Sequence, residues 1–261
     1  MNTVLCSLSR KCIQLIIIIS LIVQPVWSQK SITNQDLIWY GMSTTLKLNN
    51  KWYFQNEISE RHFINPIRQH QLVLRGHVHR ILGNSGWEGS AGMCLFLQNP
   101  NDPNSTIQLT IPELRPHVEM AMKQKLSGFS IDHRYRVEAR FFHNTNSNST
   151  ELEDDYRFGN YRFRYRVQVA IPIFKIREKQ FFKVKFGEEI FINAGSNIIY
   201  NPFDQNRLNA GISVDCFPNV TFDVDYLNWF QQRSSGDDYF NRDILRFTLF
   251  HTISLESKKN E

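Results

Sequence analysis

The histidines are the first residues whose type and spacing could do chemistry. His77 and His79 are two positions apart, so a β-strand would place both imidazoles on one face, where they could bind a metal. Histidines so spaced are more often polar interior or rim positions, and we predict no metal site and no cofactor. The chain has no Gly-x-Ser-x-Gly motif, and His117, His133 and His143 have no serine or carboxylate at a telling spacing. No catalytic residue is predicted, although distant residues can meet in a barrel, so catalysis stays open.

Glu138 is the second candidate, because it stands between Arg136 and Arg140 on one face of a period-two segment. A lone carboxylate could act as an acid or base. Arginines on the same face favour its charged form, which makes it a poor proton donor near neutrality. We therefore interpret Glu138 as an ion-pair partner.

A two-residue period surrounds these positions and dominates the chain after residue 36. In residues 161–169, one face carries Tyr161, Phe163 and Tyr165, and the other carries arginines. Successive side chains of a strand point to opposite faces, whereas a helix would scatter the arginines around its circumference. The pattern predicts a strand. Asn, Gly, Pro and Ser clusters divide the chain into segments near 36–48, 51–63, 67–81, 87–99, 111–126, 129–143, 158–172, 181–193, 205–217, 220–232 and 243–255.

These segments predict an all-β fold, an antiparallel up-and-down β-barrel. Most are long enough to cross a membrane at a tilt, which takes about 9–11 residues. Short turns such as Ser127-Gly128 alternate with longer polar loops at 100–110, 144–157, 194–204 and 233–242, as in outer-membrane barrels. Such barrels have an even number of strands, so we expect about twelve, with ten possible and an extra strand near Ser31 to Asp36.

The charged faces are expected to point inward and the aromatic faces toward lipid. Both signs of charge occur, so the side chains are expected to pair across a narrow lumen, where the planar fork of arginine holds a carboxylate in two hydrogen bonds. The predicted interior ion-pair network consists of Glu57, Arg61, Arg134, Arg136, Glu138, Arg140, Arg162, Arg164, Arg166, Lys183, Lys185, Glu189, Arg207, Asp223 and Asp225.

This set contains more cations than anions, so the lumen is expected to be electropositive and to favour anions. A densely paired interior could equally be closed, and we expect a largely filled lumen. The alternative is that the charged faces point to water in a soluble, half-exposed sheet.

The first 28 residues predict a signal peptide and not part of the fold. Arg10 and Lys11 precede an apolar run from Ile13 to Val23, and the small residue Ser28 stands before the expected cleavage point. A run of roughly 11 residues is short of the ~20 that a transmembrane helix needs. Residues 29–261 are then expected to form a single barrel domain in the outer membrane, with the periplasm as the alternative location.

Charge and cysteine content narrow the possible partners. Removing the leader lowers the net charge from +5 to +3, and no basic cluster with a recognition helix appears, so nucleic acid is not an expected partner. Cys94 and Cys216 remain, and export would permit one bridge between them. We expect a monomer in contact with outer-membrane lipid, with a small anionic solute as a possible ligand.

The chain resembles the domain of unknown function 2490 family of bacterial outer-membrane-like barrels, found mainly in Bacteroidetes-type bacteria. The resemblance covers about residues 36–255. It is carried in order by Trp39, the Glu57 to Arg61 spacing, Glu113-Leu114-Arg115-Pro116, the segments 133–140 and 162–166, Glu189-Ile190-Phe191-Ile192-Asn193 and Asn206-Arg207-Leu208-Asn209-Ala210-Gly211. The resemblance implies an exported barrel and supplies no activity, ligand or catalytic residue.

The sequence thus predicts an outer-membrane barrel with a charged, arginine-rich and largely filled lumen. It would serve as a narrow channel or as a structural envelope protein. Two alternatives stay open: an outer-membrane enzyme acting on lipid or envelope material, and a soluble periplasmic barrel that binds a small anionic ligand.

Overall fold

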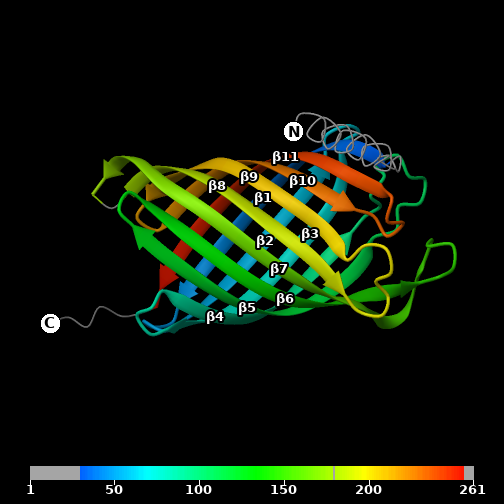
Figure 1. Ribbon diagram of the computed structural model, residues 1–261, viewed down its shortest axis with the longest axis horizontal. Coiled ribbons are helices and arrows are strands. Elements are labelled where there is room, and N and C mark those ends of the chain that lie inside the picture. Colours follow the sequence, from blue (N-terminus) through cyan, green and yellow to red (C-terminus); the bar gives the residue numbers. More distant parts are fainter. Residues whose placement is uncertain (1–29, 179, 256–261) are drawn as a thin grey trace, which may run out of the picture. The chain divides into compact units, whose positions relative to one another are not determined.

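A computed structural model describes residues 30–178 and 180–255, and these residues form a closed barrel of eleven strands (Figure 1). The expected leader, residues 1–28, lies outside the described residues. No helix in the described part is long and apolar enough to cross a membrane. The strands are β1 Ser31–Lys47, β2 Trp52–Phe63, β3 Arg68–Leu82, β4 Trp87–Gln98, β5 Ile111–Leu126, β6 Phe129–Thr145, β7 Leu152–Arg177, β8 Gln180–Ala194, β9 Phe203–Phe217, β10 Val220–Gln232 and β11 Asp238–Ser254.

Each strand pairs antiparallel with the next strand along the chain. The all-β antiparallel barrel predicted from the sequence is confirmed over these pairings. The barrel closes where β1 lies beside β11, and there Leu255 N donates to Lys47 O at 3.0 Å. Because the number of strands is odd, β1 and β11 run in the same direction, so the barrel is mixed at this one seam. Within the described residues, closure leaves neither β1 nor β11 as a free edge strand.

The strand count is close to the expected twelve, and the differences lie at strand ends. The strand expected near Ser31 to Asp36 is the beginning of β1 and not a separate strand. The loop expected at 144–157 is shorter in the structure. β6 and β7 extend into this range, and their last pair is Thr145 with Leu152. The expected loop 233–242 also ends earlier, because β11 begins at Asp238. Backbone pairing extends these hairpins through polar residues, which a hydrophobic pattern does not reveal.

The two faces of the barrel wall are inverted relative to a soluble protein. On β7, Tyr161 and Phe163 are 49% and 46% exposed on the outer face, whereas Arg162 is 3% exposed on the inner face. The other strands repeat this arrangement, with outward side chains such as Ile58 and Val118. The barrel therefore has an apolar exterior and a polar, charged interior, as expected from the period-two pattern.

The connections differ between the two rims, as Figure 1 shows. Residues 48–51, 83–86, 127–128 and 218–219 make short turns at one end, which we call the short-turn rim. Residues 99–110, 146–151, 195–202 and 233–237 make longer connections at the other end, the long-loop rim. Glycines at positive φ, such as Gly83 (66°) and Gly128 (92°), allow the tight reversals of the short-turn rim.

An apolar cluster fills part of the interior toward the long-loop rim. Trp39 and Trp229 meet edge to face, with ring centroids 5.9 Å apart. The cluster consists of Leu37, Trp39, Phe63, Leu227, Trp229 and Ile244, from β1, β2, β10 and β11. Aromatic packing here narrows the lumen beside the charged wall formed by β5 to β8.

Candidate functional site

The described residues form a cavity at each rim of the lumen. The short-turn cavity has a volume of about 560 Å³, and its lining extends from Gly86 and Phe250 down to Trp39. The long-loop cavity has a volume of about 670 Å³ and is lined by loop residues such as Asn197 and Ser234. The two cavities share no lining residue. Side chains of the wall therefore fill the space between them.

Residue order along β6 shows what separates the cavities. Arg136 lines the short-turn cavity and Arg140 lines the long-loop cavity, while Glu138 between them lines neither. Arg162 occupies the corresponding position on β7, and Phe191 occupies it on β8. Glu138, Arg162 and Phe191 are only 2%, 3% and 1% exposed. We call the buried layer between the cavities the barrier; it consists of Phe96, Arg115, Glu138, Arg162, Phe191, Trp229 and Arg242.

Glu138 is the centre of the charge network in the barrier. Its carboxylate accepts from Arg162 Nη2 at 2.5 Å and from Arg164 Nη1 at 2.5 Å. Arg136 Nη1 donates to the same group at 3.5 Å. Three arginines from two neighbouring strands thus share one buried carboxylate. Such charge-assisted bonds are about twice as strong as neutral ones, and they fix the positions of the long side chains.

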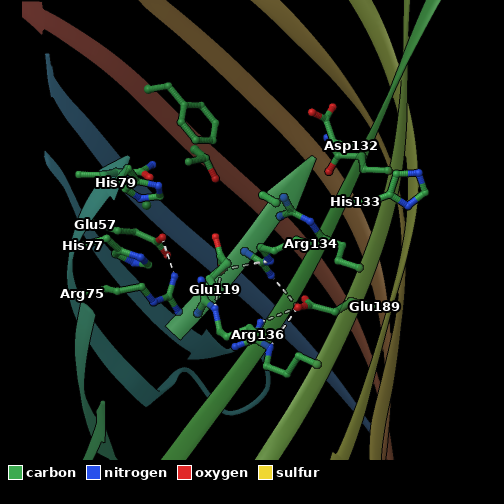
Figure 2. Close-up of a pocket in the computed structure, with 18 of the residues that line it drawn as sticks. Glu57, Arg75, His77, His79, Glu119, Asp132, His133, Arg134, Arg136 and Glu189 are labelled. Atoms are coloured by element: carbon green, nitrogen blue, oxygen red, sulfur yellow. Dashed lines mark hydrogen bonds and ion pairs between the residues drawn. The ribbon is translucent and has the colours of Figure 1, made fainter. Parts of the chain in front are cut away.

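Further carboxylates bind the same arginines from other sides. Glu189 accepts from Arg134 Nη2 at 2.6 Å and from Arg164 Nη2 at 2.8 Å. Glu119 accepts from Arg136 Nε at 2.7 Å. Figure 2 shows Glu119, Arg134, Arg136 and Glu189 pointing toward one another into the cavity. The network is therefore continuous across β5, β6, β7 and β8.

Two other groups of ion pairs lie elsewhere on the wall. Arg140 and Arg115 both donate to Glu113, each with a nitrogen–oxygen distance of 2.6 Å. On β8 to β11, Lys185 bonds to Asp223 and lies 3.1 Å from Asp225 Oδ1. These pairs neutralise much of the interior charge, so the wall can be packed closely.

The remaining residues of the predicted network differ in whether they have an acidic partner. Glu57 accepts from Arg75 of β3 at 2.6 Å, and not from Arg61 on its own strand. Lys183 lies toward the short-turn end of β8 and is bound to Asp215 at 2.7 Å. Among the described residues, Arg61, Arg166 and Arg207 have no carboxylate oxygen within 4.0 Å. The interior thus contains both neutralised and unneutralised arginines.

Other interior charges were not singled out from the sequence. Glu113, Arg115 and Glu119 lie on β5, where they alternate with Leu114, Pro116 and Val118, so the two-residue period marks their face. Arg75 follows the same rule on β3. Asp204, Arg242 and Arg246 likewise contact the network or the barrier.

His77, His79 and His117 form a cluster at the cavity wall, on the side where Figure 2 shows His77 and His79 above Arg75. His77 Nδ1 and His117 Nε2 are 3.3 Å apart, and the His79 ring stacks on Tyr53 with centroids 4.3 Å apart. In the described part of the chain, no group of three or more His, Cys, Asp or Glu side chains is arranged to hold a metal ion.

A possible nucleophile, Ser90, and a possible base, His79, are neighbours in this cluster but are not hydrogen-bonded to each other. Ser90 pairs in register with His79, and His79 Nδ1 lies 3.5 Å from Glu88 Oε1. The Ser90 hydroxyl and both ring nitrogens of His79 are buried without a hydrogen-bond partner. Nucleophilic catalysis needs the base within hydrogen-bond reach of the nucleophile. The arrangement among the described residues does not provide that contact.

The family model described as "Protein of unknown function (DUF2490)" matches residues 37–241. The chain belongs to this family. The match confirms the resemblance seen in the sequence. No curated protein matches the chain in a sequence comparison.

Two solved structures are similar to this DUF2490 member at low sequence identity. One is a NanC porin, 13% identical, with 78% of this chain and 91% of that chain covered and a TM-score of 0.46. The other is LpxR from Salmonella typhimurium, 10% identical, with 76% of this chain and 83% of that chain covered and a TM-score of 0.45.

Proposed function

We propose that this protein is an outer-membrane β-barrel with a lumen closed by side chains, which acts as an envelope protein and not as an open pore. The observation that carries the proposal is the barrier. Two cavities approach each other from opposite rims, and a buried layer containing Glu138, Arg162 and Phe191 separates them.

The exterior of the barrel supports a membrane location. Large apolar side chains such as Met93, Val118 and Phe186 are 47%, 58% and 54% exposed on the outer face. A soluble protein rarely exposes a contiguous apolar surface of more than a few hundred Å². An apolar band around a closed barrel, with short turns on one rim and longer loops on the other, is typical of outer-membrane proteins. The signal peptide expected from the first 28 residues would supply export.

The interior supports a closed lumen. Arg162 and Arg164 of β7 bind Glu138 of the neighbouring strand β6, so these side chains hold one another in place within the barrier. The Arg164 guanidinium also lies 4.4 Å from the centroid of the Phe191 ring. Moving any one of these groups would leave a buried charge without its partner, which is costly in a medium of low polarity.

A narrow channel is the second candidate, because the two cavities of about 560 and 670 Å³ are separated by a single layer of side chains. Displacement of that layer would join them. The two candidates differ in the conductance of the unmodified protein.

Conductance in planar bilayers tests the proposal. The unmodified barrel is expected to insert without steady conductance, and Phe191→Ala is expected to conduct because it removes a buried ring from the barrier. Phe163→Ala, which truncates an outward ring on the neighbouring strand, is the matched control and is expected to stay silent. Steady conductance of the unmodified protein would contradict the closed lumen and favour the channel. Recovery of the mature protein in the soluble periplasm would contradict the membrane location.

A further inference from the structure

The floor of the short-turn cavity brings two arginines to one tryptophan. Arg61 from β2, Arg207 from β9 and Trp39 from β1 all line this cavity. Arg61 Cζ lies 4.0 Å from the centroid of the Trp39 ring, and Arg207 Cζ lies 5.5 Å from it. The closed barrel thus places two like charges beside a single indole, although they come from strands far apart in the sequence.

Neither guanidinium has a carboxylate oxygen within 4.0 Å among the described residues. Arg61 Nη1 donates to Gln71 Oε1 at 2.7 Å, and Arg207 Nη2 donates to Gln205 Oε1 at 3.1 Å, so both partners are neutral amides. Glu189, the register neighbour of Arg207, is instead bound by arginines of β6 and β7. An unneutralised buried charge is costly. The cost would be offset by an anion bound between the two arginines.

The same three residues also have unused hydrogen-bond donors. Arg61 Nε, Arg207 Nε and Trp39 Nε1 are buried and have no hydrogen-bond partner. Arg61 and Trp39 are only 5% and 2% exposed. Nearly all buried donors in proteins have an acceptor, so three without one on a single cavity floor require an explanation. An oxyanion would supply both the acceptors and the negative charge.

The cavity above this floor sets the size and polarity of the ligand. Its volume of about 560 Å³ is much larger than a bare inorganic ion needs and falls in the range of small-molecule pockets. Its lining includes ten Lys or Arg and six Asp or Glu side chains, together with polar groups such as Gln55 and Tyr53. These features fit a hydrophilic organic anion and exclude a hydrophobic one.

We propose that Arg61, Arg207 and Trp39 form an anion-binding site that takes the carboxylate or phosphate group of a small hydrophilic solute, such as a sugar acid or a sugar phosphate. Arginine suits either group, because its planar fork of donors matches two oxygens. The site adjoins the barrier, because the Arg207 guanidinium lies 4.9 Å from the centroid of the Phe191 ring and 4.4 Å from that of Trp229. Binding is measured in the unmodified barrel, so either outcome of its conductance measurement would leave this proposal standing.

Calorimetric titration of the detergent-solubilised barrel tests the site. The probes are gluconate for the carboxylate, glucose 6-phosphate for the phosphate, and glucose as the neutral compound of similar size. We expect at least one of the two anions to bind and glucose not to bind. Binding of only one anion would identify the group that the site takes. Absence of binding by both, or equal binding of glucose, would overturn the proposal.

Substitutions then locate the site. Arg207→Gln and Arg61→Gln are each expected to weaken anion binding about 10-fold or more, since each removes a charged donor. Trp39→Phe keeps a ring but loses the Nε1 donor, and a loss of about fivefold is expected. Arg75→Gln is the matched control: it removes the same charge from the same cavity, but Arg75 is already bound to Glu57 at 2.6 Å.

The control is expected to change the affinity by less than about threefold, because the charge of Arg75 is already compensated by Glu57. Equal losses in Arg75→Gln and Arg207→Gln would mean that only the general field of the cavity attracts the anion, which would overturn the assigned site. A second measurement separates binding from folding. The anion is expected to raise the melting temperature of the unmodified barrel but not that of Arg207→Gln, whose melting temperature without anion is expected to be no lower. A lower value in Arg207→Gln without anion, together with retained binding, would show a structural role instead.

Discussion

Replacing Glu138 by glutamine tests the reasoning about the interior most directly. The change keeps the shape of the side chain and removes its charge. Glu138 is 2% exposed and accepts hydrogen bonds from Arg136, Arg162 and Arg164. Glu138→Gln would therefore leave three buried guanidinium groups with one carboxylate fewer.

The magnitude follows from what each arginine retains. Removing one partner of a buried ion pair costs about 3–5 kcal/mol. Here Arg162 keeps Asp204 at 3.1 Å and Arg164 keeps Glu189 at 2.8 Å. Arg136 likewise keeps a carboxylate at 2.7 Å. We therefore expect the lower end of the range, about 3 kcal/mol, which lowers the folding equilibrium constant on the order of 100-fold.

The assay is urea unfolding of the barrel in detergent, followed by the gel mobility of unheated samples. Glu60→Gln is the control, because Glu60 lies near the surface and contacts His62 and Gln69. A surface substitution of this kind is expected to change stability by no more than about 0.5 kcal/mol. If Glu138→Gln unfolds at the same urea concentration as Glu60→Gln, the ion pairs at Glu138 do not stabilise the barrel.

Three further predictions concern the wall, the exterior and the thiols. Arg164→Ala is expected to lower the free energy of unfolding by about 3–5 kcal/mol in the same urea assay, because it breaks pairs with two buried carboxylates. Asn146→Ala, which removes bonds within an exposed loop, should cost about 1 kcal/mol, and equal effects would show that the interior position of Arg164 is unimportant. Val137→Arg places a charge on the outer face. If this position lies near the middle of the bilayer, the free energy of unfolding in lipid vesicles is expected to fall by about 2–4 kcal/mol. An unchanged free energy of unfolding would argue against a lipid-facing wall. Cys94 and Cys216 are both free thiols, and Cys94 is buried whereas Cys216 is exposed. A thiol reagent should therefore label Cys216 quickly in the folded mature barrel and Cys94 only in denaturant. Fast labelling of both thiols, or of neither, would contradict this arrangement.

Much of the fold could be predicted, because the residues of a strand alternate between its two faces and their polarity therefore shows what each face contacts. In residues 161–169, alternation alone identifies the strand and separates Arg162 and Arg164 from Phe163, and the structure places these two sets inside and outside. The same alternation located eleven segments. It failed at strand ends, where hairpins such as that joining Thr145 to Leu152 are extended by backbone pairing through polar residues.

The choice of ion-pair partners could not be predicted, because it depends on register and on the reach of side chains across the barrel. Glu57 and Arg61 share a face of β2, yet Glu57 binds Arg75, its neighbour in register on β3. Arg61 lies in the row of Trp39 and Gln71, where the pairing provides no carboxylate. Strand pattern cannot distinguish these two arginines, because their positions on the strand are equivalent.

The sequence by itself determined that the chain forms long strands with one charged and one apolar face, since period two is a local property of an extended backbone. Only the tertiary structure decided how the charged faces meet. Closing the barrel brought β1, β2 and β9 around one cavity floor, grouped Arg61 and Arg207 at Trp39 without an acid, and placed Glu138 among three arginines. These contacts join residues that are distant in sequence, so they depend on closure and register, and no local pattern encodes them.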